Sequence, residues 1–140
     1  MSNTDTISGY MANLDAGDIA GAQKHFAPEF EFVSPFGTIT DLEGHAGLGE
    51  AFKSSFSGMD HQVDDAWEVE DVVFVEGTWR GTNTGPLALP DGTVLPSTGK
   101  FVEFPWAGVG RVEAGLLTSL HIYFDVASFM SQLGLMPAAA

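Results

Sequence analysis

The sequence contains no cysteine and very few basic residues. Without cysteine, neither a disulfide framework nor a thiolate nucleophile can form. Only 5 lysines and arginines stand against 19 aspartates and glutamates, which gives a formal net charge of −14. Because such a charge repels phosphate groups, we expect neither nucleic acid nor an anionic membrane surface to be a partner.

Long apolar runs and targeting signals are missing as well. No apolar stretch approaches the length of a membrane-spanning helix, and the opening Met-Ser-Asn-Thr-Asp-Thr lacks the basic and apolar regions of a signal peptide. We therefore expect a soluble, cytoplasmic protein. With 140 residues, of which 44% are hydrophobic, the chain is expected to form one domain, residues 1–140, around a single core.

Helical patterns gather in the first part of the chain. A first helix is marked by Ile7, Tyr10, Met11 and Leu14 and is predicted to end near Gly17. A second begins at a capping Asp18 and ends before Pro28. Leu48, Phe52 and Phe56 are spaced one turn apart and predict a third helix.

Strand patterns dominate the rest of the chain. Alternating residues predict strands at 29–36, about 63–70, 72–81, 101–112 and 116–124, and the last four are expected to form a meander. The stretch 81–99 is rich in glycine, proline and threonine and is interpreted as an extended hairpin loop, with a lid over a pocket as the alternative. Early helices and late strands predict an α+β fold, with one curved antiparallel sheet packed on N-terminal helices.

Residues 120–137 are the most informative segment. A strand of aromatic and branched residues is followed by Asp125, which is placed to cap a short helix. Gly134 and Pro137 are expected to end that helix. Its apolar stripe is formed by Val126, Phe129, Met130 and Leu133.

This segment resembles the C-terminal end of SnoaL-like proteins, the polyketide-cyclase branch of the nuclear transport factor 2-like, ketosteroid isomerase-like superfamily. Members close with a strand ending in Tyr-x-Asp and a helix ending in Gln-Leu-Gly, as residues 123–125 and 132–134 do here. The likeness extends upstream through residues 77–85, 96–99 and 102–105. It implies a cone-shaped α+β barrel and a homodimer formed through the convex face of the sheet, where His121, Tyr123 and Phe101 are expected to lie.

Side-chain alternation predicts which residues line the concave face of the sheet. If the charged residues of each strand face water, an aromatic and nearly uncharged set points inward, although a bulge at Pro105 would shift part of one strand. The predicted substrate-binding residues are Phe32, Ser34, Trp79, Phe104, Trp106, Leu120, Ile122 and Phe124.

The sequence departs from its relatives at the catalytic positions that the resemblance implies. SnoaL-type cyclases and limonene-epoxide hydrolases carry an acid/base aspartate on the last strand, where this chain has Ile122. A histidine that the cyclases hold two residues earlier corresponds to Leu120, and an Arg and Asp pair of the hydrolases corresponds to Gly77 and Trp79. The usual proton-transfer residues are therefore missing.

Four other residues are candidates for catalysis. Asp125 is a possible general acid/base, but a capping role explains it without chemistry. His45 and His61 are further acid/base candidates. Their spacing to nearby aspartates would suit a metal, but no tight three-ligand motif exists, so no metal is expected. Tyr10 either points into the pocket as a hydroxyl donor or belongs to the core.

Two function classes remain. The resemblance implies a cofactor-independent enzyme that acts on a hydrophobic, carbonyl-bearing small molecule by cyclase, isomerase or lyase-type acid/base chemistry. The alternative is a protein that binds such a molecule without changing it, and the apolar Ile122 at the usual aspartate position favours this alternative.

Overall fold

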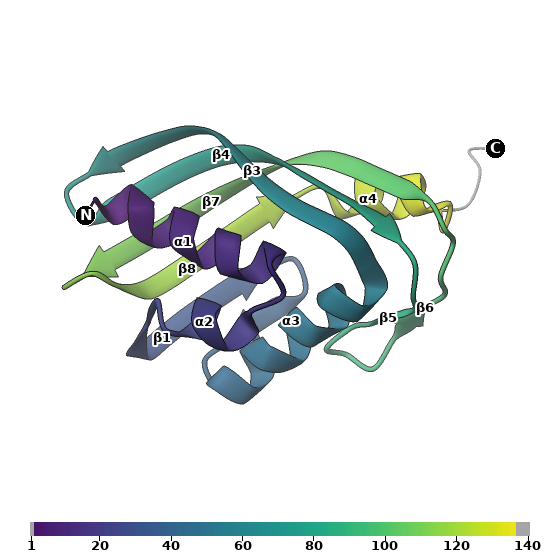
Figure 1. The fold of residues 1–140 in the computed structure, drawn as a ribbon, viewed down its shortest axis with the longest axis horizontal. Coiled ribbons are helices and arrows are strands. Elements are labelled where there is room, and N and C mark those ends of the chain that lie inside the picture. Colours follow the sequence, from purple (N-terminus) through teal and green to yellow (C-terminus); the bar gives the residue numbers. More distant parts are fainter. Residues whose placement is uncertain (1, 137–140) are drawn as a thin grey trace.

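The computed structural model describes residues 2–136, which contain four helices and eight strands (Figure 1). The helices are α1 (Asn3–Asp15), α2 (Ile19–Gln23), α3 (Leu42–Ser55) and α4 (Val126–Leu133). The strands are β1 (Phe26–Ser34), β2 (Gly37–Ile39), β3 (Phe56–Val69), β4 (Val72–Asn83), β5 (Leu87–Ala88), β6 (Val94–Leu95), β7 (Phe101–Glu113) and β8 (Leu116–Phe124).

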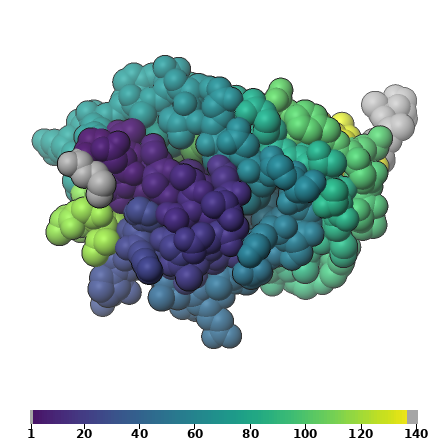
Figure 2. All heavy atoms as spheres, in the orientation of Figure 1, coloured from purple at the N-terminus to yellow at the C-terminus, as the bar shows by residue number. Residues whose placement is uncertain are grey.

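Six strands form one curved, unclosed sheet in the order β2-β1-β8-β7-β4-β3. Helices α1, α2 and α3 lie on one side of this sheet, and the space-filling view shows their residues covering it (Figures 1 and 2). The α+β class with a curved sheet on N-terminal helices is therefore confirmed, as is the meander of β3, β4, β7 and β8.

One pairing differs from the antiparallel expectation, because β1 runs parallel to β8. The two strands are separated in sequence by α3 and most of the sheet, and such a long connection permits parallel pairing. The start of β1 also differs. Helix α2 ends at Gln23, and β1 already includes Pro28, which lies within a break in the β1–β8 register between Phe26 and Glu31. A proline is tolerated there because no ladder hydrogen bond is required from it.

Helix ends follow local side-chain chemistry. Asp18, Asp41 and Asp125 each accept a backbone N–H in the first turn of α2, α3 and α4, respectively. Gly134 ends α4 in the left-handed conformation, with φ of 80°, as expected for a glycine stop. The expected stop at Pro137 lies outside the described residues. Phe56 begins β3 rather than extending α3, so β3 starts earlier than predicted.

Regular alternation in the central strands builds the concave wall. Val73, Val75 and Trp79 of β4 are buried, and so are Phe104 and Trp106 of β7. The pairing of these strands runs without a break from Val72–Arg111 to Thr82–Phe101, so Pro105 causes no bulge. Glycine is needed at position 77, since a Cβ there would overlap the Gln62 carbonyl oxygen and lie 2.7 Å from Trp106 Nε1.

Residues 81–99 pack against α3 and contribute no side chain to the cavity between the sheet and the helices. The buried Asn83 side chain donates to the carbonyls of Ser55 and Gly85 and accepts from the Thr98 backbone N–H. Leu87 is buried in the core, and β5 pairs with β6. The stretch is thus an anchored hairpin. No helix within residues 2–136 has the length and apolar character needed to cross a bilayer.

Candidate functional site

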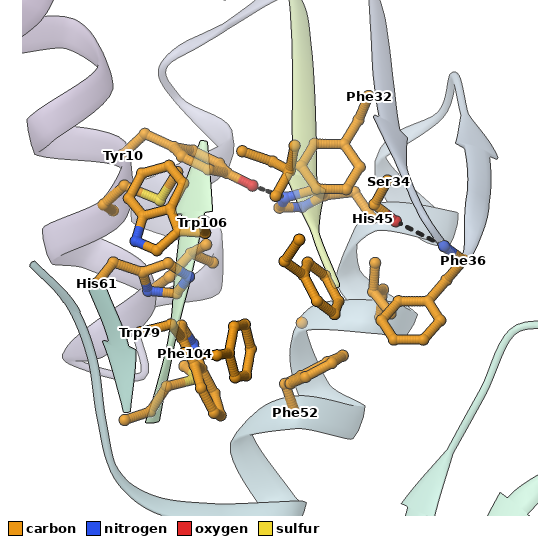
Figure 3. A pocket seen from close by; sticks show the side chains of 17 residues that line it. Tyr10, Phe32, Ser34, Phe36, His45, Phe52, His61, Trp79, Phe104 and Trp106 are labelled. Atoms are coloured by element: carbon orange, nitrogen blue, oxygen red, sulfur yellow. Dashed lines mark hydrogen bonds between the residues drawn. The ribbon is translucent and has the colours of Figure 1, made fainter. Parts of the chain in front are cut away.

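A cavity of about 110 Å³ lies between the concave face of the sheet and helices α1 and α3 (Figure 3). Seven of the eight predicted substrate-binding residues line it: Phe32, Ser34, Trp79, Phe104, Trp106, Ile122 and Phe124. The helices and β3 add further apolar side chains that the strand alternation did not predict: Met11, Leu14, Leu48, Phe52 and Met59, with Phe36 from the β1–β2 turn. The alternation of side chains along a strand cannot identify residues that a helix contributes to a cavity.

Leu120 is fully buried but does not line the cavity. Its register partner on β7 is Gly110, and a Cβ added to Gly110 would lie 2.5 Å from Ile7 Cδ1 of α1. Helix α1 therefore packs directly on the sheet at this level, which places Leu120 in the solid core beside the cavity.

Asp125 also lies outside the lining of the cavity. Its carboxylate accepts the Ser128 backbone N–H at 3.2 Å, which is the geometry of an N-cap. Asp41 acts in the same way for α3, and Asp64 accepts hydrogen bonds from Gln62 and Thr78. These two aspartates therefore do not join the neighbouring histidines, and residues 2–136 hold no cluster of three or more potential metal ligands.

The polar groups of the cavity come from Tyr10, His45, His61, Ser34 and the indole N–H groups of Trp79 and Trp106, and no carboxylate, lysine or arginine lines it. The Trp106 indole N–H is buried and has no hydrogen-bond partner among residues 2–136. The Ser34 hydroxyl accepts the Phe36 backbone N–H at 3.2 Å. Tyr10, His45 and His61 belong to two separate hydrogen-bonded groups at the cavity wall.

The first group pairs His61 of β3 with Asp15, the last residue of α1. His61 Nδ1 lies 2.6 Å from Asp15 Oδ1, and the His61 backbone N–H donates to Asp15 Oδ2 at 2.8 Å. Both side chains are largely covered, with exposed fractions of 16% and 19%. A carboxylate accepts hydrogen bonds only, so Asp15 holds the proton of a neutral His61 on Nδ1. The lone pair of Nε2 is left free, and Nε2 has no hydrogen-bond partner among residues 2–136.

The ring of His61 is enclosed by aromatic side chains. Its centroid lies 5.8 Å from that of Trp106 and 6.4 Å from that of Trp79, both in edge-to-face orientation. These contacts and the two bonds to Asp15 fix the ring at the cavity wall (Figure 3). The arrangement is that of a histidine base oriented by a carboxylate.

Sequence reasoning identified His61 but missed Asp15. The two residues are 46 positions apart, and only the packing of α1 against β3 brings them together. One signal was present: Asp15 lies at the C-terminal end of α1, where the helix dipole disfavours a negative charge. A carboxylate in that position indicates a partner elsewhere in the fold.

The second group is a hydrogen-bonded chain of the half-buried Gln23 and the buried His45 and Tyr10. The Tyr10 hydroxyl lies 2.7 Å from His45 Nε2, and Gln23 Nε2 lies 3.1 Å from His45 Nδ1. Burial lowers the pKa of His45 to about 4 and raises the pKa of Tyr10, so both are neutral at ordinary pH. Tyr10 thus belongs to the core and to the cavity wall at once.

On the opposite face of the sheet, His121 is paired within its own chain. Its Nε2 lies 2.8 Å from Glu31 Oε1, and Nδ1 lies 3.4 Å from the hydroxyl of Tyr123. Any interface on this face would therefore meet a histidine that already has a carboxylate partner.

Comparison with known proteins agrees with this architecture. The family model of the SnoaL-like domain matches residues 7–120 of this chain. No curated protein matches the chain. Among solved structures, IdmH of Streptomyces antibioticus, a proposed polyketide cyclase, is 25% identical with a TM-score of 0.78, over 96% of this chain and 99% of IdmH.

Two further structures share the fold at lower identity. A proposed SnoaL-like polyketide cyclase from Jannaschia sp. CCS1 has a TM-score of 0.81 and 17% identity, over 96% of this chain and 93% of that one. A protein from Catenulispora acidiphila with a ketosteroid isomerase-like fold, in complex with trimethylamine, has a TM-score of 0.77 and 20% identity, over 94% and 93%. The chain belongs to the SnoaL-like family and has the nuclear transport factor 2-like, ketosteroid isomerase-like fold.

Proposed function

We propose that the protein is an acid/base enzyme that acts on a hydrophobic, carbonyl-bearing small molecule, with His61 as the base. The observation that carries this proposal is the His61–Asp15 pair at the wall of an otherwise apolar cavity. His61 presents a free Nε2, and Asp15 stabilises the imidazolium that forms when Nε2 takes a proton.

The chemistry follows from these groups. Nε2 removes a proton from the carbon next to the carbonyl, the C–H bond breaks, and its electron pair moves to the carbonyl oxygen as an enolate. Return of the same proton to another atom of the substrate gives isomerisation. Alternatively, the enolate carbon attacks a second carbonyl and closes a ring, and the alkoxide that forms takes the proton back from Nε2. Both outcomes use groups of this chain alone, so the proposed reaction requires no cofactor. The aromatic walls exclude water that would otherwise protonate the enolate.

The proposal also accounts for Ile122 at the position where relatives carry their acid/base aspartate. His61 reaches the same cavity from β3, whereas Ile122 is on β8. The base would thus have moved to another strand, while the binding cavity was kept. The likeness to the proposed cyclase IdmH supports a substrate of the polyketide type.

A binding protein without turnover is the second candidate, favoured by the apolar Ile122 and the lack of any carboxylate in the cavity lining. One experiment distinguishes the enzyme from the binding protein. Native mass spectrometry of the purified protein identifies any retained molecule, which is then incubated with fresh protein. A catalyst converts that molecule, and His61→Gln binds it but converts it at least about 100-fold more slowly. Retention without conversion by the unaltered protein would establish the binding function.

We also propose a homodimer formed through the face of the sheet opposite the cavity. Phe101 and Tyr123 are more than half exposed there, and Trp67 and Phe74 are exposed cross-strand partners on the same face. Exposed aromatic side chains on one sheet face are typical of an association surface. The acidic segment 60–76 contributes two of these aromatic residues, Trp67 and Phe74.

A further inference from the structure

The chain of hydrogen bonds from Gln23 to Tyr10 has a defined direction. Gln23 Nε2 donates to the Leu42 carbonyl oxygen at 2.8 Å, which identifies this atom as the amide nitrogen. The same nitrogen lies 3.1 Å from His45 Nδ1. An amide nitrogen can only donate, so Nδ1 must accept and carries no proton.

The tautomer of His45 then decides the role of Tyr10. A neutral imidazole with a bare Nδ1 carries its proton on Nε2, which donates to the Tyr10 oxygen over 2.7 Å. The hydroxyl proton of Tyr10 cannot point back at His45. The Tyr10 hydroxyl has no other hydrogen-bond partner among residues 2–136, and Tyr10 lines the cavity, so its proton is free for an acceptor in the cavity.

We infer that Gln23, through His45, makes Tyr10 a hydrogen-bond donor to the ligand, and that the cavity therefore selects a neutral molecule with an accepting carbonyl oxygen. Gln23 is a positioning residue in this account, because it does not line the cavity. This inference rests on the proposed function, since it identifies the group that the same cavity recognises. Tyr10 would donate a hydrogen bond to the substrate oxygen on which the enolate charge develops, while His61 faces the proton to be removed.

Gln23 is required because a phenol left alone with a neutral imidazole donates to it. Without the amide of Gln23, the His45 proton moves to Nδ1 and the Tyr10 hydroxyl turns toward Nε2. The cavity would then face a lone pair of the Tyr10 oxygen, which repels a carbonyl oxygen. Gln23→Met, which has a similar length and no amide, tests this step.

The binding test uses two probes of nearly equal shape, acetophenone and α-methylstyrene, which differ by an oxygen in place of a methylene group. The measured quantity is the ratio of their dissociation constants, which cancels general effects on the cavity. We expect Tyr10→Phe to raise the ketone-to-alkene ratio by about three- to tenfold, the value of one neutral hydrogen bond. Gln23→Met should raise it similarly although Tyr10 is retained.

Matched controls are Tyr123→Phe on the opposite face and Gln132→Met on α4, which should leave the ratio unchanged. The ratio is measured at binding equilibrium, so this test is independent of turnover. If Gln23→Met weakens both probes equally, Gln23 has only a structural role and the inference is overturned. An unchanged ratio in Tyr10→Phe would overturn it as well.

A second measurement needs no variant. Side-chain ¹⁵N NMR of the unaltered protein distinguishes the two neutral tautomers of His45 directly. We expect the proton on Nε2 and a bare Nδ1. A proton on Nδ1 would reverse the direction of the hydrogen bonds between Gln23, His45 and Tyr10. That result would refute the inference, even if the variants failed to fold.

Discussion

The burial of neutral His45 predicts that the protein loses stability as the pH falls below about 6.5. His45 lies on α3 with its ring against Tyr10, Phe26 and Phe32, and protonation would place a charge among them. It would also put an Nδ1–H opposite the N–H of Gln23. The folded state therefore resists the proton, whereas the unfolded chain accepts it at the ordinary histidine pKa.

The size of the effect follows from the two pKa values. The pKa of His45 falls from 6.5 to about 4 on folding. The folded pKa is the lower one, so the stability is complete above the unfolded value and declines as the pH falls toward 4. Between pH 7 and pH 5, the contribution of this one residue changes by about 2 kcal/mol.

Urea unfolding at pH 7 and pH 5 measures this change when it is compared with His45→Gln. The variant is expected to be less stable at both pH values because the two hydrogen bonds of the His45 ring are disturbed. Its loss of stability between pH 7 and pH 5 should nevertheless be about 2 kcal/mol smaller than that of the unaltered protein. An equal loss in both proteins would show that His45 is protonated in the folded state and would refute the reasoning.

Further predictions concern stability and association. Asp125→Asn should preserve the free energy of unfolding, whereas Asp125→Ala should lower it by about 1 kcal/mol in urea titrations, and equal values would argue against the N-cap role. Phe129→Ala removes a buried ring that contacts Phe52, Phe104 and Phe124, and a loss below about 3 kcal/mol would contradict this packing. Sedimentation velocity should give a dimer that Tyr123→Asp converts to monomer, and monomeric unaltered protein would reject the interface. Because Glu31 already pairs with His121, mild acid should not dissociate that dimer.

Local patterns predicted the wall of the cavity well. Strand alternation places Trp79, Phe104 and Trp106 on one face because successive side chains of a strand point to opposite sides. The caps at Asp18 and Asp125 depend on residues within three positions of each other, so they too are readable from sequence.

The polar part of the site depends on contacts between distant segments. Asp15 meets His61 across 46 positions, and Gln23 meets His45 across 22. No periodicity or spacing encodes such pairs, because they arise only when α1 and α2 pack onto β3 and α3. The exclusion of Leu120 from the cavity has the same origin, since it depends on where Ile7 of α1 meets Gly110 of β7. Helix packing thus determines which polar side chains meet at the cavity, whereas strand patterns determine only its apolar wall.

The central claim, that His61 removes a proton next to a carbonyl, is tested most directly by hydrogen exchange on a bound ketone. Acetophenone is incubated with the protein in D₂O, and NMR measures the replacement of its methyl protons by deuterium. The unaltered protein is expected to exceed the rate in buffer, and His61→Gln should lower the accelerated rate about 100-fold or more while acetophenone still binds. Exchange by His61→Gln at the rate of the unaltered protein, or no acceleration by either, would contradict the account.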